Sequence, residues 1–140
     1  MANKLNLEVV TPRKLVVSEE VDLCTVPGGD GVFGVMANHA PILATLKIGE
    51  MHYENDGNTV RLAVSGGFVE VSKNKMTVLA EAAEVSEEID VERALRAKER
   101  AEKRLQEAKA GREDIDMARA QAALARALVR LSVAGQSSRV

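Results

Sequence analysis

The feature that most constrains this chain is a run of strong helix formers in its last third, from Ser86 to Val133. Ala, Leu, Glu, Lys, Arg and Gln dominate there, and these residues have the highest intrinsic helix propensities. The run contains no proline, and its one glycine, Gly111, is followed closely by Asp114 and Asp116. Because a glycine ends helices and an aspartate caps them, the sequence predicts two antiparallel helices joined by a short turn. We expect them at residues 90–110 and 115–133.

The rest of the chain has a different pattern, in which short apolar and polar alternations are separated by turn residues. Alternation with a period of two indicates β-strands, and no helical pattern interrupts them. Gly66 and Gly67 are expected to end one strand before the next begins. The fold class is therefore β + α, an antiparallel β-sandwich over residues 1–84 followed by a helical hairpin over residues 85–140. The expected strands are residues 5–10, 15–17, 21–26, 32–36, 42–46, 50–54, 59–65, 68–72 and 76–80.

Four arginines lie at similar distances from the turn along the two expected antiparallel helices. Arg93 and Arg100 are seven residues apart and share a helix face, as do Arg126 and Arg130, which are four apart. If both pairs face the same side, four guanidinium groups converge, and such forks suit phosphate oxygens. The same spacing is also typical of separate solvated charges on surface helices. Spacing alone leaves both interpretations open, and the solvated one is the simpler.

Charge is distributed unevenly along the chain. Residues 1–85 carry 7 Lys/Arg and 11 Asp/Glu, whereas residues 86–140 carry 12 and 10. After Asp116 the chain has four arginines, the last of them Arg139, and no acidic residue. This excess indicates an acidic partner or a bound anion for the second helix, unless glutamates of the first helix offset it.

Composition and motifs argue against several functional classes. Only three aromatic residues occur, so nucleic-acid binding by base stacking is not expected. No apolar run approaches the ~18 residues that span a membrane, and the start of the chain has no signal-peptide pattern. The glycine-rich segment 27–34 lacks the Gly-Lys-Ser/Thr end of a phosphate loop. His39 and His52 have no second ligand at metal spacing, so we expect a non-catalytic protein in which His39 is a loop hydrogen-bonding residue.

The single cysteine, Cys24, lies in a run that alternates as a strand. One cysteine cannot form an internal disulfide, and it suits a reducing compartment. We expect it to be a small residue within a strand.

The expected contact between the helices is rich in alanine, which buries little area. We therefore expect a hairpin that opens or detaches easily, with a spare apolar stripe on the second helix available to pack on the β domain. The stripe of the first helix is Val91, Ala94, Leu95, Ala101, Leu105 and Ala108. The stripes of the second helix are Ile115, Ala118, Ala122, Ala125 and Val129, and Met117, Leu124, Leu128 and Leu131.

Four segments carry a resemblance to a known family: Val9–Pro12, Gly34–Leu43, Ser65–Val71 and Arg130–Val133. A Ser-Gly-Gly-Phe segment with an upstream His-Ala-Pro and a C-terminal helical hairpin is a specific combination. Over essentially its whole length, the chain resembles the epsilon subunit of bacterial F-type ATP synthases.

The resemblance implies a β-sandwich of about ten strands followed by two helices. It implies a non-catalytic place on the central rotor stalk, beside the gamma subunit and on the c-ring, without direct membrane insertion. The protein would then be peripheral on the cytoplasmic face of the cell membrane. The family couples proton flow to ATP synthesis and restrains ATP hydrolysis. Its helices move between a folded hairpin and an extended form that inserts among the alpha and beta subunits.

The resemblance also implies a partner contact for the gamma subunit and the c-ring. Val32 stands where some relatives carry an acidic residue, so valine cannot make the polar contact that an acid would make there. The expected contact residues are Gly31, Val32, Phe33, Gly34, His39 and Pro41.

Members of the family that bind ATP carry Ile/Leu-Asp-x-x-Arg-Ala at the start of the first helix, where this chain has Ile89-Asp90-Val91-Glu92-Arg93-Ala94. The resemblance thus implies ATP as a regulatory ligand, with the need for magnesium left open, and it favours the anion interpretation of the arginines. The implied ATP-binding residues are Glu84, Ile89, Asp90, Arg93, Ala94, Arg100, Arg126 and Arg130.

Two other functions remain to be weighed. A transcription-factor-like module could insert the hairpin into a polymerase channel, with Glu113, Asp114 and Asp116 holding a metal, although helix capping is the simpler role for the aspartates. A stand-alone nucleotide sensor would need the arginines but no partner surface. Copurification with membrane complexes would distinguish a sensor from a rotor subunit.

Overall fold

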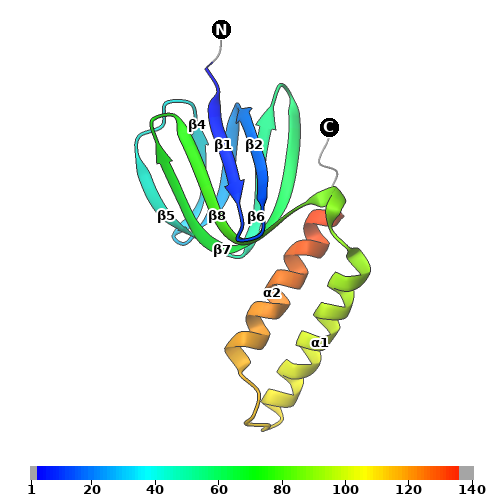
Figure 1. Cartoon of the computed structure of the whole chain (residues 1–140). Helices are drawn as coiled ribbons and strands as arrows, with labels where there is room; N and C mark the ends of the chain where they lie inside the picture. Colours follow the sequence, from blue (N-terminus) through cyan, green and yellow to red (C-terminus); the bar gives the residue numbers. More distant parts are fainter. Residues whose placement is uncertain (1–2, 136–140) are drawn as a thin grey trace.

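The computed structural model describes residues 3–135, which form a β domain and a helical hairpin that projects from one end of it (Figure 1). The strands are β1 (Leu5–Val10), β2 (Leu15–Val21), β3 (Leu23–Gly28), β4 (Gly31–Met36), β5 (Ile42–Leu46), β6 (Gly49–Asn55), β7 (Asn58–Ser72) and β8 (Lys75–Val85). A 3₁₀ helix, η1 (Ser86–Glu88), leads into α1 (Val91–Lys109) and α2 (Met117–Ala134). The sandwich followed by a two-helix hairpin confirms the predicted fold class.

The strands are hydrogen-bonded in the order β2-β1-β8-β7-β5-β3-β4, and β6 pairs with β3 and β7. Most pairs are antiparallel, but β1 and β8 run parallel, with Val9 opposite Val78. The expectation of a purely antiparallel domain was wrong at this pair. β1 and β8 are the first and last strands of the domain, so no tight turn connects them and forces an antiparallel direction.

Alternating aliphatic residues from every strand fill the space between the layers, and within residues 3–135 Tyr53 is the buried aromatic residue of this core. β1 shows the pattern clearly, because Leu5, Leu7 and Val9 are buried while the residues between them are not. Cys24 is completely buried in β3, and burial raises the pKa of its thiol to about 12. The cysteine is thus the small strand residue that the alternation predicted, and its burial makes the thiol unreactive.

The domain has eight strands, not the nine expected segments or the ten of the resemblance, because Gly66 and Gly67 do not end a strand. β7 runs through both glycines and remains paired with β8 on either side of them. Both have positive φ, 52° and 138°, so the chain bends there without leaving the sheet. A Cβ at Gly67 would lie 1.8 Å from the carbonyl oxygen of Leu79. The bend lets one long strand pair first with β6 and then with β5.

The two helices lie antiparallel, as predicted, and alanines form the buried seam between them. The buried residues along this contact are Ala94 and Ala101 of α1 and Ala120 and Ala127 of α2. Both pairs are seven residues apart, which lets them oppose one another on antiparallel helices. The prediction of the α2 stripes was wrong on this point, because it omitted Ala120 and Ala127.

Several larger apolar side chains of the predicted stripes are instead exposed. Val91 and Leu95 of α1 and Met117 and Leu128 of α2 all have more than a third of their surface open to solvent. No helix within residues 3–135 is long and apolar enough to cross a bilayer.

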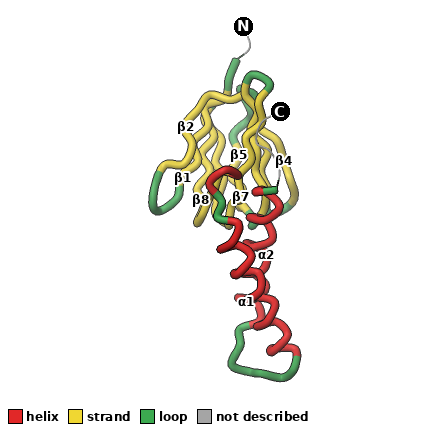
Figure 2. Tube along the Cα trace, turned by 90° about the vertical axis from the view of Figure 1, so that its right-hand side faces the viewer, coloured by secondary structure: helices red, strands yellow, loops and turns green. Residues whose placement is uncertain are grey.

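The hairpin is attached to the β domain near the C-terminal end of α2. Val133 is fully buried against Ala63 of β7 and Ile89, with Val129 and Ala134 packed around them. Nearby, the guanidinium Nε of Arg130 donates to a carboxylate oxygen of Glu84 at the end of β8. Figure 2 shows the rest of the hairpin extending away from the sandwich toward the turn.

The alanine seam yields a prediction about hairpin stability. Ala120→Leu should destabilise the hairpin by about 1–3 kcal/mol, because a larger side chain cannot fit between the helices without separating them. Ala118→Leu is the matched control, since Ala118 is exposed on the same turn of α2. Urea unfolding followed by circular dichroism at 222 nm would measure the difference, and equal stability of the two variants would contradict the seam.

Candidate functional site

A groove of about 940 Å³ lies where the hairpin meets the β domain. It is lined by both helices, by the end of β8 and by the turn between β1 and β2. We call it the base groove. Seven of the eight residues predicted to bind ATP line it: Glu84, Asp90, Arg93, Ala94, Arg100, Arg126 and Arg130.

The two helices bring the four predicted arginines to this one groove, which is one of the two arrangements that their spacing left open. α1 presents Arg93 and Arg100, both exposed, and α2 presents Arg126 and Arg130, both half-buried. With Arg13 and Lys14, six cationic side chains line the base groove. Its lining contains three acidic residues, Glu81, Glu84 and Asp90. The groove therefore has an excess of positive charge.

Asp90 has a structural role at the start of α1. Its Oδ1 accepts a hydrogen bond of 3.1 Å from the backbone N–H of Arg93, which makes it the N-cap of the helix. The carboxylate that makes this cap also lies within the lining of the groove.

Only part of the arginine charge is neutralised within the chain. Arg130 is paired with Glu84, and both side chains remain about one-third exposed. Among residues 3–135, Arg93, Arg100 and Arg126 form no ion pair. Guanidinium groups keep their charge at any ordinary pH, so three of them along one groove favour a bound anion.

Sequence reasoning missed the contribution of the β1–β2 turn. Thr11 Oγ1 accepts from the backbone N–H groups of Arg13 and Lys14, each at 3.3 Å, and so holds the turn in shape. Because β1 and β8 are parallel, the turn that follows β1 lies beside the last residues of β8. No local signal in the sequence indicates this neighbour, since it depends on the pairing of the first and last strands.

The structure places Ile89 outside the lining of the base groove. Its side chain is buried with Ala63 and Val133 in the contact that anchors α2. Ile89 therefore helps to pack the base of the hairpin onto the β domain, although it is next to Asp90 in the sequence.

At the hairpin turn, two of the three acidic residues considered for a metal, Asp114 and Asp116, have other partners. Asp116 is the N-cap of α2 and accepts from the backbone N–H of Arg119 at 3.1 Å. Asp114 accepts from Nε of Arg112 at 2.8 Å, and this bond lowers the pKa of the carboxyl group. Within the part of the chain that the structure describes, no three His, Cys, Asp or Glu side chains are grouped to hold a metal.

The residues predicted to contact partners lie on and after β4, at the surface of the sandwich. Val32 is 73% exposed, and Gly31, Gly34 and Pro41 are also exposed, whereas Phe33 and His39 are half-buried. The ring Nδ1 of His39 lies 2.6 Å from the carbonyl oxygen of Ala40, which agrees with the predicted loop hydrogen bond.

Exposed apolar side chains also lie on β5 and β7, which pair with each other. Leu43 of β5 and Phe68 of β7 are 72% and 55% exposed, and Phe68 is directly opposite Leu79 of β8. An apolar surface of this kind on a sandwich is typical of a site that another protein covers.

Comparison with known families accounts for both parts of the chain. Residues 4–86 match the family model "ATP synthase, Delta/Epsilon chain, beta-sandwich domain", and residues 87–135 match "ATP synthase, Delta/Epsilon chain, long alpha-helix domain". The chain belongs to the ATP synthase delta/epsilon chain family.

Arg139, the last arginine of the predicted cationic segment, lies outside the described residues.

Curated relatives of this family are similar over most or all of the chain. An ATP synthase epsilon chain of Nitratidesulfovibrio vulgaris is 54% identical over 109 residues, which is 78% of this chain and 81% of the relative. That of Geotalea daltonii is 50% identical over 139 residues, which covers 99% of both chains.

Solved structures share the fold at lower identity. A chain in the Euglena gracilis mitochondrial ATP synthase (OSCP/F1/c-ring) superposes with a TM-score of 0.79 at 24% identity, covering 97% of this chain and 84% of that one. A chain in the Tetrahymena thermophila mitochondrial ATP synthase central stalk/c-ring structure gives 0.59 at 13% identity, covering 96% of both.

Two substitutions can distinguish the helix-capping role of Asp90 from a role in binding a ligand. Asp90→Ala should destabilise α1 by about 1 kcal/mol because the Arg93 N–H loses its acceptor, whereas Asp90→Asn should retain most of the stability because Asn is an equally good N-cap. Thermal unfolding followed by circular dichroism would measure both variants. A loss of equal size in the two would mean that the negative charge, and not the cap, stabilises the helix.

Proposed function

We propose that this chain is the non-catalytic central-stalk rotor subunit of a proton-translocating F-type ATP synthase. It would couple proton flow to ATP synthesis and restrain ATP hydrolysis through its two helices. Family membership and the epsilon-chain relatives that align along nearly the whole chain support this role. The solved structures that share the fold include a c-ring and a central stalk, which agrees with this role.

In this role the β domain is the attachment to the rotor, peripheral on the cytoplasmic face of the membrane. The exposed apolar side chains on β4, β5 and β7, among them Val32, Leu43 and Phe68, offer a surface for the gamma subunit and the c-ring. Covering them would remove apolar area from water, which is the main driving force of stable association.

The base groove is the regulatory ATP site in this proposal, and one observation carries it. Arg93, Arg100 and Arg126, which form no ion pair within residues 3–135, line a groove together with Arg130 and Asp90. The ATP phosphates would accept hydrogen bonds from guanidinium groups of both helices and so hold α1 against α2. Asp90 and Glu84 would contribute acceptors beside this cluster, and the need for magnesium stays open.

Binding at the base groove would favour the folded hairpin by mass action. A ligand at about a hundredfold excess over its Kd stabilises the form that binds it by about 2.7 kcal/mol. The alanine seam contributes little, so this amount can decide between folded and open helices. When ATP falls, the released cationic α2 would engage the alpha and beta subunits and stop hydrolysis.

Calorimetry with ATP on the isolated protein tests the site. Wild type should bind ATP and gain thermal stability, and Arg126→Gln should weaken binding about tenfold or more, because it loses a charge-assisted hydrogen bond. Arg96→Gln is the matched control, since Arg96 is an exposed arginine of α1 that lines neither this groove nor the one near the turn. Absence of heat with wild type, or equal loss in the two variants, would reject the ATP site.

Removal of the helices tests whether they are what restrains ATP hydrolysis. A chain ending at Glu88 retains all eight strands, so it should fold and still bind the gamma subunit. It should no longer restrain hydrolysis, since α1 and α2 are absent. ATPase assays of reconstituted complexes measure the rate of hydrolysis. Inhibition as strong as that of the full chain would mean that the β domain, and not the helices, restrains hydrolysis.

A further inference from the structure

A second groove, of about 750 Å³, lies between α1 and α2 close to the hairpin turn. We call it the tip groove. Arg104 and Arg119 line the tip groove and not the base groove, whereas Arg93 and Arg130 line only the base groove. Arg100 and Arg126 line both. The tip groove therefore has cationic residues of its own.

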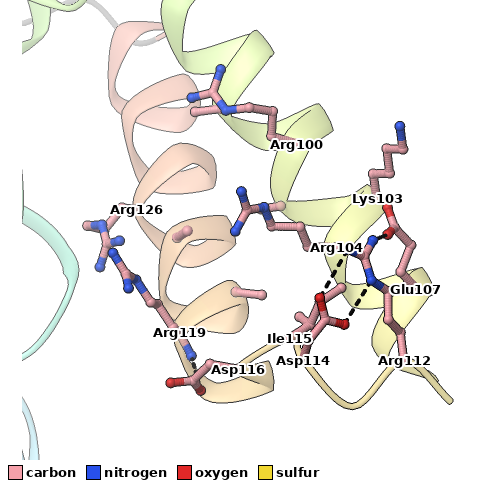
Figure 3. Close-up of a pocket in the computed structure, with 14 residues that line it drawn as sticks. Arg100, Lys103, Arg104, Glu107, Arg112, Asp114, Ile115, Asp116, Arg119 and Arg126 are labelled. Atoms are coloured by element: carbon pink, nitrogen blue, oxygen red, sulfur yellow. Dashed lines mark hydrogen bonds and ion pairs between the residues drawn. The ribbon is translucent and has the colours of Figure 1, made fainter. Parts of the chain in front are cut away.

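The acidic side chains of the tip groove are occupied by other partners. Glu107 and Asp114 both hold Arg112, which bridges the end of α1 to the turn. The carboxylate of Asp116 caps α2. Figure 3 shows the Arg112–Asp114 bonds at the turn, on the far side of the groove from Arg119.

Four arginines of the tip groove remain without such a partner. Within residues 3–135, Arg100, Arg104, Arg119 and Arg126 form no ion pair. In Figure 3, Arg100 and Arg104 extend from α1 toward α2, whereas Arg119 and Arg126 lie together at the edge of α2 that is away from α1 in this view. Arg100 and Arg104 are one helical turn apart on one face, so their side chains are neighbours.

The floor of the groove restricts what it can hold. It consists of alanines, among them Ala97, Ala101, Ala120 and Ala123, and Ile115 is the only larger apolar residue in the lining. No aromatic ring lines the groove, and its acceptors are occupied, so it lacks partners for a nucleoside. The chemistry that fits is a compact anion with several phosphate oxygens, because guanidinium forks bind such oxygens in pairs.

We propose that the tip groove binds a short chain of linked phosphates, such as tripolyphosphate, as an anion site separate from the base groove. The anion bridges Arg104 of α1 and Arg119 of α2 and neutralises charges that otherwise repel each other across a seam of alanines. Bridging holds the helices together at the turn, the end of the hairpin that is far from the β domain (Figure 2). The same phosphate chain could be free or the tail of a nucleotide, and the experiment below distinguishes these sources.

The experiment is calorimetric titration of the full chain with sodium tripolyphosphate at fixed ionic strength, using three variants. The tip variant carries Arg104→Gln and Arg119→Gln. The charge-matched control carries Arg96→Gln and Lys98→Gln, two residues of α1 that line neither groove. The base variant carries Arg93→Gln, which removes a residue of the base groove alone. Glutamine is a good helix former, so all three should fold, and circular dichroism verifies this.

Wild type, the charge-matched control and the base variant should bind tripolyphosphate with similar Kd, and the tip variant should bind about tenfold or more weakly. ATP should bind the tip variant as it binds wild type, which shows that the nucleotide is not the occupant of the tip groove. Absence of binding to wild type overturns the proposal, as does equal weakening in the tip variant and the charge-matched control. Loss in the base variant alone would place the anion in the base groove and also overturn it. Because Arg93 lines only the base groove, ATP titration of the base variant tests the proposed ATP site separately, and either site can fail without the other.

Discussion

Contact between small alanine side chains holds α1 against α2, and the behaviour of the hairpin depends on how little that contact contributes. At about 25 cal/mol per Å² of buried apolar surface, methyl groups at four seam positions stabilise the helix pair weakly. Small side chains also let the helices approach closely, which brings the arginines that flank the seam toward one another. Attraction along the seam is therefore opposed by repulsion along both of its grooves, and the proposed anions would change this balance.

The hairpin is anchored at one end only. Val133, Ile89 and Ala63 pack at its base, where the ion pair between Arg130 and Glu84 also joins α2 to β8. Beyond this anchor, the helices extend away from the sandwich to the turn (Figure 1). The base groove lies beside the anchor and the tip groove beside the turn, so ligands at the two would stabilise opposite ends of the same weak seam.

The β domain contributes to the base groove through its topology. The parallel pairing of β1 with β8 places the turn at Thr11–Lys14 beside the end of β8, where Glu84 lies. An aliphatic core drawn from every strand makes this platform rigid, while the apolar side chains left on its surface are free for partners. In the proposed role, one domain would attach to the rotor and also complete the base groove with the helices.

The sequence by itself determined the features that depend on near neighbours in the chain. Helix propensity, the break at Gly111 and the caps at Asp90 and Asp116 are local features. The hairpin, and the spacing of its four arginines along the two helices, could therefore be predicted. Tertiary structure alone decided what depends on remote pairing. Ala120 and Ala127 are buried because of how the helices cross, and alanine, common on every face, does not mark the buried one. Gly67 bends β7 without ending it because β8 supplies hydrogen bonds on both sides. Arg13 and Lys14 reach the base groove only because the first and last strands of the sandwich pair in parallel, an arrangement that no local pattern encodes.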